Sequence, residues 1–149
     1  MRQPVTTIRA SIAAMALLLA TPFVAGDVRA DDMAAAPNDT VLTDGGHRYA
    51  CTGIAESKYD PRWNEFPLKI VAATVEGDYL GDIAVTVRDG NGTVQVATHC
   101  LAPWFLADLA PGRYEVTVVA RGQYEKTVNV TVGTSQTQVV VHFEQINDT

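Results

Sequence analysis

Apolar and polar residues alternate with a period of two from Leu68 to Phe143, which is the pattern of strands with one buried face. The run 68–75 is nearly all apolar and predicts a strand buried on both faces. Turn-forming residues separate the later runs at short intervals. We therefore expect seven strands, at 68–75, 82–89, 93–100, 103–109, 113–120, 124–132 and 137–143.

The clearest turn is Asp89-Gly90-Asn91-Gly92, which predicts a hairpin between the second and third strands. Because neighbouring strand residues point to opposite faces, parity assigns each run an inner face. Cys100 falls on the inner parity, whereas His99 and His142 fall on the outer one. The expected inner residues are Ile83, Val85, Val87, Val94, Val96, Thr98, Tyr114, Val116, Val118, Ala120, Val128, Val130 and Val132.

Seven short strands without a helix long enough for a crossover point to one architecture. Each strand is too short to bury its face alone, so two sheets must cover each other. We expect an all-β fold, a seven-stranded antiparallel β-sandwich.

The region before Leu68 has no sustained period. Residues 31–47 mix small residues with Asp, Asn, Pro and Gly, which predicts a flexible arm. In the following extension, Asp60-Pro61 predicts a helix start and Pro67 an end, giving one short helical turn. Trp63 and Phe66 would then share a face and cover the core.

The N-terminus has the features of a secretory signal peptide. Two arginines precede the apolar run 11–26, and Ala30 ends a Val-Arg-Ala cleavage signal. A membrane anchor is disfavoured because Pro22, Gly26 and Asp27 shorten the apolar run. We divide the chain into a signal peptide (1–30), a flexible arm (31–47), an extension with a helical turn (48–67), a β-sandwich (68–144) and a tail (145–149).

Charge narrows the classes of partner. The full chain has a net charge of −6, and removing residues 1–30 takes away three Arg and one Asp, so the charge becomes −8. An acidic chain without a basic cluster disfavours nucleic acid and anionic membrane surfaces. We expect no membrane insertion after signal cleavage and a periplasmic or secreted location.

Cys51 and Cys100 both follow the signal peptide. An even pair in an oxidising compartment predicts one disulfide, with a free buried thiol as the alternative. Two lone cysteines without a Cys-x-x-Cys spacing give no recognisable metal site. The adjacent His99 and Cys100 do not form a nucleophilic dyad if they lie on a strand, because they then point to opposite faces.

The stretch LADLAPGRYEVTVVARGQY, residues 106–124, carries a Leu-x-Pro-Gly-x-Tyr element followed by alternating apolar residues and a Gly-x-Tyr. With the Asp89–Gly92 turn, it resembles the carboxypeptidase regulatory-like domain, a transthyretin-like (prealbumin-like) seven-stranded sandwich. The Pro-Trp pair before this element and the signal peptide are similar to small exported proteobacterial proteins that contain this domain alone. The element's fold positions are Leu109, Pro111, Gly112 and Tyr114.

This resemblance implies a sandwich and a non-catalytic role, since the family is an accessory domain. One departure is the loop 100–103, which replaces an Asp-x-x-Gly turn of the family. No zinc-binding His-x-x-Glu pattern occurs, and the C-terminal FEQINDT lacks the Tyr-Arg-Gly-Ser tail of hydroxyisourate hydrolases on the related fold. We expect no enzyme activity, no cofactor and no metal site, including one formed by His47, His99 and His142.

Two classes of function remain open. One is a binding module for a protein, peptide or glycan, in which Trp104, Trp63 or Tyr79 would stack on a sugar ring if the ligand is a glycan. The other is a structural or envelope-stress protein that assembles through a sheet edge.

Overall fold

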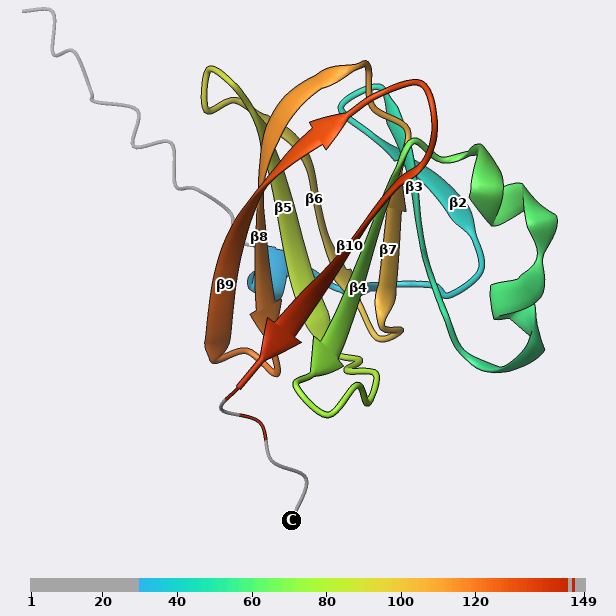
Figure 1. Cartoon of the computed structure of the whole chain (residues 1–149), viewed down its shortest axis with the longest axis vertical. Helices are drawn as coiled ribbons and strands as arrows, with labels where there is room; N and C mark the ends of the chain where they lie inside the picture. Colours follow the sequence, from blue (N-terminus) through green and yellow to red (C-terminus); the bar gives the residue numbers. More distant parts are fainter. Residues whose placement is uncertain (1–29, 145, 147–149) are drawn as a thin grey trace, which may run out of the picture.

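The computed structural model describes residues 30–144 and 146, and shows an all-β sandwich of two five-stranded sheets (Figure 1). Sheet A has the strand order β1-β6-β5-β8-β9, and sheet B has the order β10-β4-β7-β3-β2. The strands of sheet A are β1 (Ala35–Ala36), β5 (Ile83–Asp89), β6 (Val94–Cys100), β8 (Gly112–Ala120) and β9 (Tyr124–Val132). Those of sheet B are β2 (Val41–Asp44), β3 (His47–Thr52), β4 (Leu68–Thr74), β7 (Trp104–Ala107) and β10 (Thr137–Phe143).

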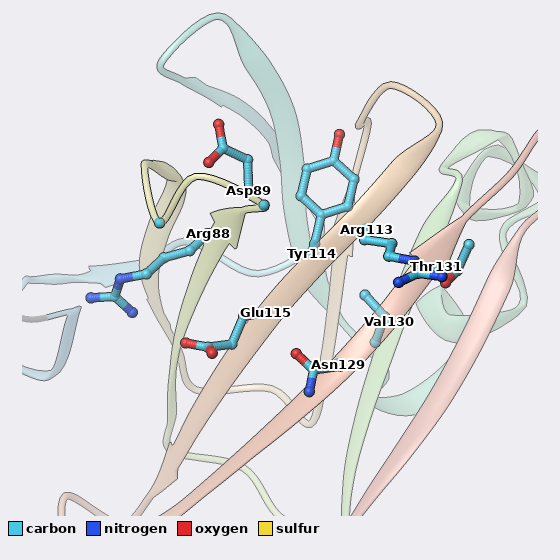
Figure 2. A pocket seen from close by; sticks show the side chains of 10 residues that line it. Arg88, Asp89, Arg113, Tyr114, Glu115, Asn129, Val130 and Thr131 are labelled. Atoms are coloured by element: carbon cyan, nitrogen blue, oxygen red, sulfur yellow. The ribbon is translucent and has the colours of Figure 1, made fainter.

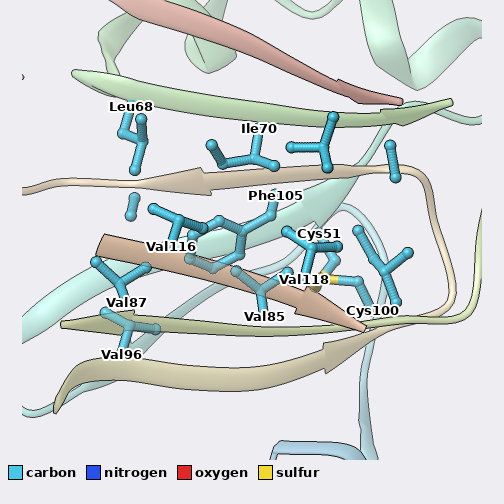
Figure 3. Packing of buried hydrophobic residues seen from close by; sticks show 14 of the residues in the cluster. Cys51, Leu68, Ile70, Val85, Val87, Val96, Cys100, Phe105, Val116 and Val118 are labelled. Atoms are coloured by element: carbon cyan, nitrogen blue, oxygen red, sulfur yellow. A yellow bond between two sulfur atoms is a disulfide. The ribbon is translucent and has the colours of Figure 1, made fainter. Parts of the chain in front are cut away.

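The main core lies between the two sheets and is filled by branched aliphatic side chains around Phe105 (Figure 3). Sheet A contributes Val85, Val87, Val96, Val116 and Val118, which are fully buried, and sheet B faces them with Leu68 and Ile70. The parity expected from the alternating pattern is therefore confirmed on β5 and β8, and on β6 from Val96 onward, whereas Val94 at the start of β6 is exposed. Each methylene removed from water here stabilises the fold by about 0.8 kcal/mol.

All seven expected strands are present, as β4 to β10, and the Asp89–Gly92 turn joins β5 to β6 in an antiparallel hairpin. The carboxylate of Asp89 shapes this turn by accepting hydrogen bonds from the backbone N–H groups of Asn91 and Thr93. The Pro111-Gly112 turn also leads directly into a strand, as expected, because Gly112 is the first residue of β8.

The prediction of seven antiparallel strands is wrong in count and in direction. The described residues form ten strands, and both sheets are mixed, because β10 pairs parallel with β4 and β1 pairs parallel with β6. The chain crosses from sheet A to sheet B after β9, so β10 does not form a hydrogen-bonded ladder with β9 as a hairpin strand would. It lies instead along β4 in the same direction, with Thr137 opposite Leu68.

The expected arm (31–47) and extension (48–67) supply the three additional strands and are part of the sandwich. The β2–β3 hairpin extends sheet B beyond β7, and Ala36 of β1 is buried in the main core. Asp44 of β2 accepts a hydrogen bond from the backbone N–H of Ala97 at 3.1 Å, so it covers the edge of β6. Pairing with distant strands orders this segment despite its weak local pattern.

The expected helical turn is present as the 3₁₀ helix η3 (Pro61–Glu65), and a second 3₁₀ helix that was not expected, η2 (Ala55–Tyr59), precedes it. Asp60 caps η3 by accepting a hydrogen bond from the N–H of Arg62. Trp63 and Phe66 do share a face, but they cover the outer side of sheet B, where they pack on Ala50 and Leu106. They form a second small core and do not close the main one.

The predicted signal peptide (1–30) lies outside the described residues except for Ala30. This residue begins η1 (Ala30–Asp32), a 3₁₀ helix beside β5 and β6, and is buried. Of the predicted tail (145–149), Ile146 is described, and its side chain is buried in the main core. No helix in the described part of the chain is long and apolar enough to cross a membrane.

Candidate functional site

A disulfide joins Cys51 to Cys100, as expected from the pair of cysteines. Cys51 lies on β3 of sheet B and Cys100 on β6 of sheet A, so the bond ties the two sheets together inside the core (Figure 3). Both residues are fully buried. Because both sulfurs are bonded, neither cysteine serves as a thiolate nucleophile.

The two aromatic residues Tyr79 and Trp104 lie together on the outer side of sheet B. Their rings meet edge to face with centroids 6.1 Å apart. The Lys69 ammonium lies 3.4 Å from the centroid of the Trp104 ring, and burial lowers the pKa of this lysine. We call Lys69, Tyr79 and Trp104 the aromatic patch.

Trp104 itself is poorly placed to stack on a ligand. Gly53 packs against its ring so closely that an added Cβ would lie 2.6 Å from Cγ, and Lys69 covers the ring as well. The side chain is 9% exposed, and its indole N–H has no hydrogen-bond partner among the described residues. Tyr79, at 53% exposed, is the accessible aromatic ring of the patch.

Trp63 is separate from the aromatic patch. It is buried, its indole N–H donates to the carbonyl of Ser57 at 2.8 Å, and the Arg62 guanidinium lies 4.1 Å from its ring centroid. Every group by which it could bind a ligand is engaged within the protein. The structure therefore brings together two of the three aromatic residues proposed from the sequence, and assigns Trp63 to the second core.

A groove of about 610 Å³ opens at one end of sheet A (Figure 2). Its walls come from three places: Arg88, Asp89 and the glycines of the β5–β6 turn, residues 113–115 at the start of β8, and residues 129–131 at the end of β9. We call it the polar groove. None of the residues proposed as binding residues from the sequence lines it, although Tyr114, assigned to the fold element, does.

Cross-strand pairing determines the order of the side chains in the polar groove. Arg88 lies opposite Glu115, which lies opposite Asn129, so these three side chains form one row across the outer face. Arg113 and Thr131 form the next row. Figure 2 shows the two arginine side chains pointing apart, on either side of Glu115.

Tyr114 supports the groove from the inner side of β8. Its hydroxyl donates to the carbonyl of Ala110 at 2.7 Å, which ties the turn before β8 to the strand. Burial and the nearby Asp89 carboxylate raise the pKa of Tyr114 above its ordinary value of 10.0. The phenol is therefore neutral at physiological pH and presents a hydroxyl oxygen beside the groove.

The three histidines are each engaged locally and lie in different places. His99 binds the carboxylate of Asp82 at 2.6 Å on the outer face of sheet A, and His142 contacts the carbonyl of Thr74. His47, expected in a flexible arm, lies on β3 and contacts Gln95. Within residues 30–144 and 146, no group of three His, Cys, Asp or Glu side chains could hold a metal ion.

Side-chain hydrogen bonds cover several strand edges. Between the edge strands β9 and β10, Thr137 donates to the carbonyl of Thr131, and the Lys126 ammonium donates to the carbonyl of His142 at 2.7 Å. Capped carbonyl groups and a lysine on an edge strand oppose pairing with another chain. The edge of β6 is covered by Asp44, as described above.

Comparisons with known proteins do not assign a family to this chain. No protein-family model matches the sequence, and no curated protein matches it.

The polar groove was missed by sequence reasoning because its residues come from three separated segments. A usable signal was present in the sequence, since Arg88 precedes the predicted Asp89–Gly92 turn and Arg113 follows the predicted Pro-Gly turn. Recognising that the two turns lie at the same end of one sheet required the register of β5 against β8.

Proposed function

We propose that this chain is a non-catalytic, exported binding domain of the carboxypeptidase regulatory-like type, and that its ligand binds in the polar groove. The observation that carries the proposal is the groove's lining: two guanidinium groups, two carboxylates, an amide and two hydroxyls gathered at one end of sheet A. Such groups bind and orient a polar ligand by hydrogen bonding.

The arrangement of possible catalytic groups supports a binding role. Both cysteines are joined in the disulfide, and the histidines lie outside the groove lining. Asp89 is also engaged, because its carboxylate accepts hydrogen bonds from the turn and from the amide of Gln95. Apart from Val130, the remaining groove side chains are hydrogen-bonding groups, so the groove is suited to recognition.

The two alternatives from the sequence have less support. Glycan binding through tryptophan would require an open ring, but Trp63 is buried and Trp104 is covered by Gly53 and Lys69. Assembly through the β9 or β10 edge is opposed at one carbonyl group on each strand, that of Thr131 and that of His142, which a side chain already binds. The disulfide and the predicted signal peptide support an exported location.

The test is a thermal-shift screen with neutral and acidic oligosaccharides and short peptides. Asn129→Trp places a large ring in the polar groove, and Thr127→Trp places the same ring on β9 at a position that also faces outward but does not line the groove. We expect at least one compound to raise the melting temperature of wild type and Thr127→Trp, and to lose this effect in Asn129→Trp.

Three results would overturn the proposal. One is that no compound shifts the melting temperature of the wild type. Another is an equal shift in wild type and Asn129→Trp, which would place the binding site elsewhere. The third is chemical conversion of the bound compound, detected by mass spectrometry, because the proposal is a binding domain without catalysis.

A further inference from the structure

Resting on the proposed function, we infer that the ligand of the polar groove is an acidic oligosaccharide, whose carboxylate groups bind Arg88 and Arg113. The juxtaposition that carries the inference is the placement in one groove of two arginines that have no partner among the described residues, on an otherwise acidic chain.

Arg88 and Arg113 differ from the other basic residues of the described chain. Within residues 30–144 and 146, no hydrogen bond, ion pair or ring contact engages either guanidinium, and both line the polar groove. Each of the remaining Lys and Arg side chains there has a partner inside the protein. They are Arg48, Lys58, Arg62, Lys69, Arg121 and Lys126.

This distribution favours an anionic ligand. The full chain has a net charge of −6, so a general surface position would repel anions. In the polar groove, two guanidinium groups stand against two carboxylates, so the lining is neutral on an acidic chain. The Asp89 carboxylate faces the turn N–H groups that bind it, which leaves Glu115 as the acidic side chain beside the arginines. A guanidinium binds a carboxylate through two parallel hydrogen bonds, which gives geometry as well as charge complementarity.

The separation of the arginines favours a ligand with more than one carboxylate. Arg88 and Arg113 lie on neighbouring strands in a diagonal relation, for which Cα atoms are about 7–8 Å apart. Because their side chains point apart (Figure 2), one carboxylate does not bridge both in this arrangement. An oligomeric ligand with a carboxylate on each unit can contact each arginine with a different unit.

The other polar groups of the groove indicate that this ligand is a saccharide. Glu115 accepts hydrogen bonds, Asn129 both donates and accepts, and Thr131 offers a hydroxyl, which are the partners that sugar hydroxyl groups use. Tyr114 adds the edge of an aromatic ring and a hydroxyl oxygen. A ligand that combines carboxylates with many hydroxyl groups satisfies the whole lining.

The experiment is isothermal titration calorimetry of the full chain with a tri-galacturonate. Maltotriose serves as the neutral saccharide, and citrate as a carboxylate without a sugar. The variants are Arg88→Gln and Arg113→Gln, which remove the charge and keep much of the side-chain length. Arg121→Gln is the matched control, since it removes the same charge from the β8–β9 turn at the other end of sheet A.

We expect tri-galacturonate to bind wild type and Arg121→Gln equally. Each groove variant should weaken binding by about tenfold or more, the usual effect of losing a charged hydrogen bond. Binding should also weaken as salt is added, because part of the attraction is between exposed charges.

The other outcomes overturn the inference in distinguishable ways. Maltotriose binding at least as tightly as tri-galacturonate, with wild-type affinity in Arg113→Gln, would overturn the ligand class and leave the binding domain in place. Citrate binding as tightly as tri-galacturonate would show an anion site without saccharide recognition. If no compound of the wider screen binds, both the inference and the proposed function fail.

Discussion

Removing the Cys51–Cys100 disulfide should lower the stability of the sandwich by a defined amount. The bond closes a loop over a sequence separation of 49 residues between the two sheets. Restricting the unfolded chain over a loop of this length is worth about 4 kcal/mol at 25 °C. This is a large share of the roughly 5–15 kcal/mol by which a small domain is stable.

The assay is urea unfolding of wild type and of the double variant Cys51→Ala/Cys100→Ala. We expect a lower midpoint and a larger dependence on urea, because the unfolded variant exposes more surface without the cross-link. The two single variants, measured in reductant, lose the same bond and should fall by a similar amount. A loss below about 1 kcal/mol, the size of an ordinary substitution, would refute the reasoning.

Three further predictions concern the fold. Deleting residues 31–44 should cost about 3 kcal/mol in thermal unfolding, because it removes the buried Ala36 and the half-buried Leu42 and uncovers the β6 edge; an unchanged melting temperature would show that this segment is a dispensable arm. Gly53→Ala should destabilise by about 3 kcal/mol, through backbone strain at φ +107° and a clash with Trp104. Gly77→Ala, at φ +99° in open space, is its control and should cost about 1 kcal/mol; equal losses would contradict the clash. Tyr114→Phe should cost about 1 kcal/mol near neutral pH. Because the folded pKa of Tyr114 is raised, its contribution is complete below pH 10.0 and is lost as pH rises through the folded pKa. Ultraviolet titration should therefore lose one phenol ionisation above pH 10.0 in Tyr114→Phe, and an unaltered curve would contradict this assignment.

The local hydrophobic pattern was sufficient to predict the strands that bury one face over a long run of residues. The alternation of Val85 and Val87, or of Val116 and Val118, is visible in the sequence and is the same in the fold. The strands β1 and β2 were missed because they have two and four residues, too few to show a period. They form through partners far along the chain, as when Asp44 binds the backbone of Ala97.

Strand direction and the polar groove could not be read from local pattern for a related reason. Apolar and polar residues can alternate in the same way in a parallel and an antiparallel strand. The residues of β10 therefore do not reveal that the strand runs parallel to β4. The groove likewise depends on register, which brings Arg88 opposite Glu115 and Glu115 opposite Asn129. For aromatic residues the sequence suggested exposure, whereas Gly53 and Lys69 cover Trp104.

The central claim is that the ligand site lies in the polar groove at the end of sheet A. A map of backbone amide shifts by nuclear magnetic resonance, recorded during titration with tri-galacturonate, tests it most directly. The account predicts that the largest shifts fall on residues 88–92, 113–115 and 129–131, and that they are lost in Arg113→Gln. Shifts centred on Tyr79 and Trp104, with the groove amides unchanged, would contradict it.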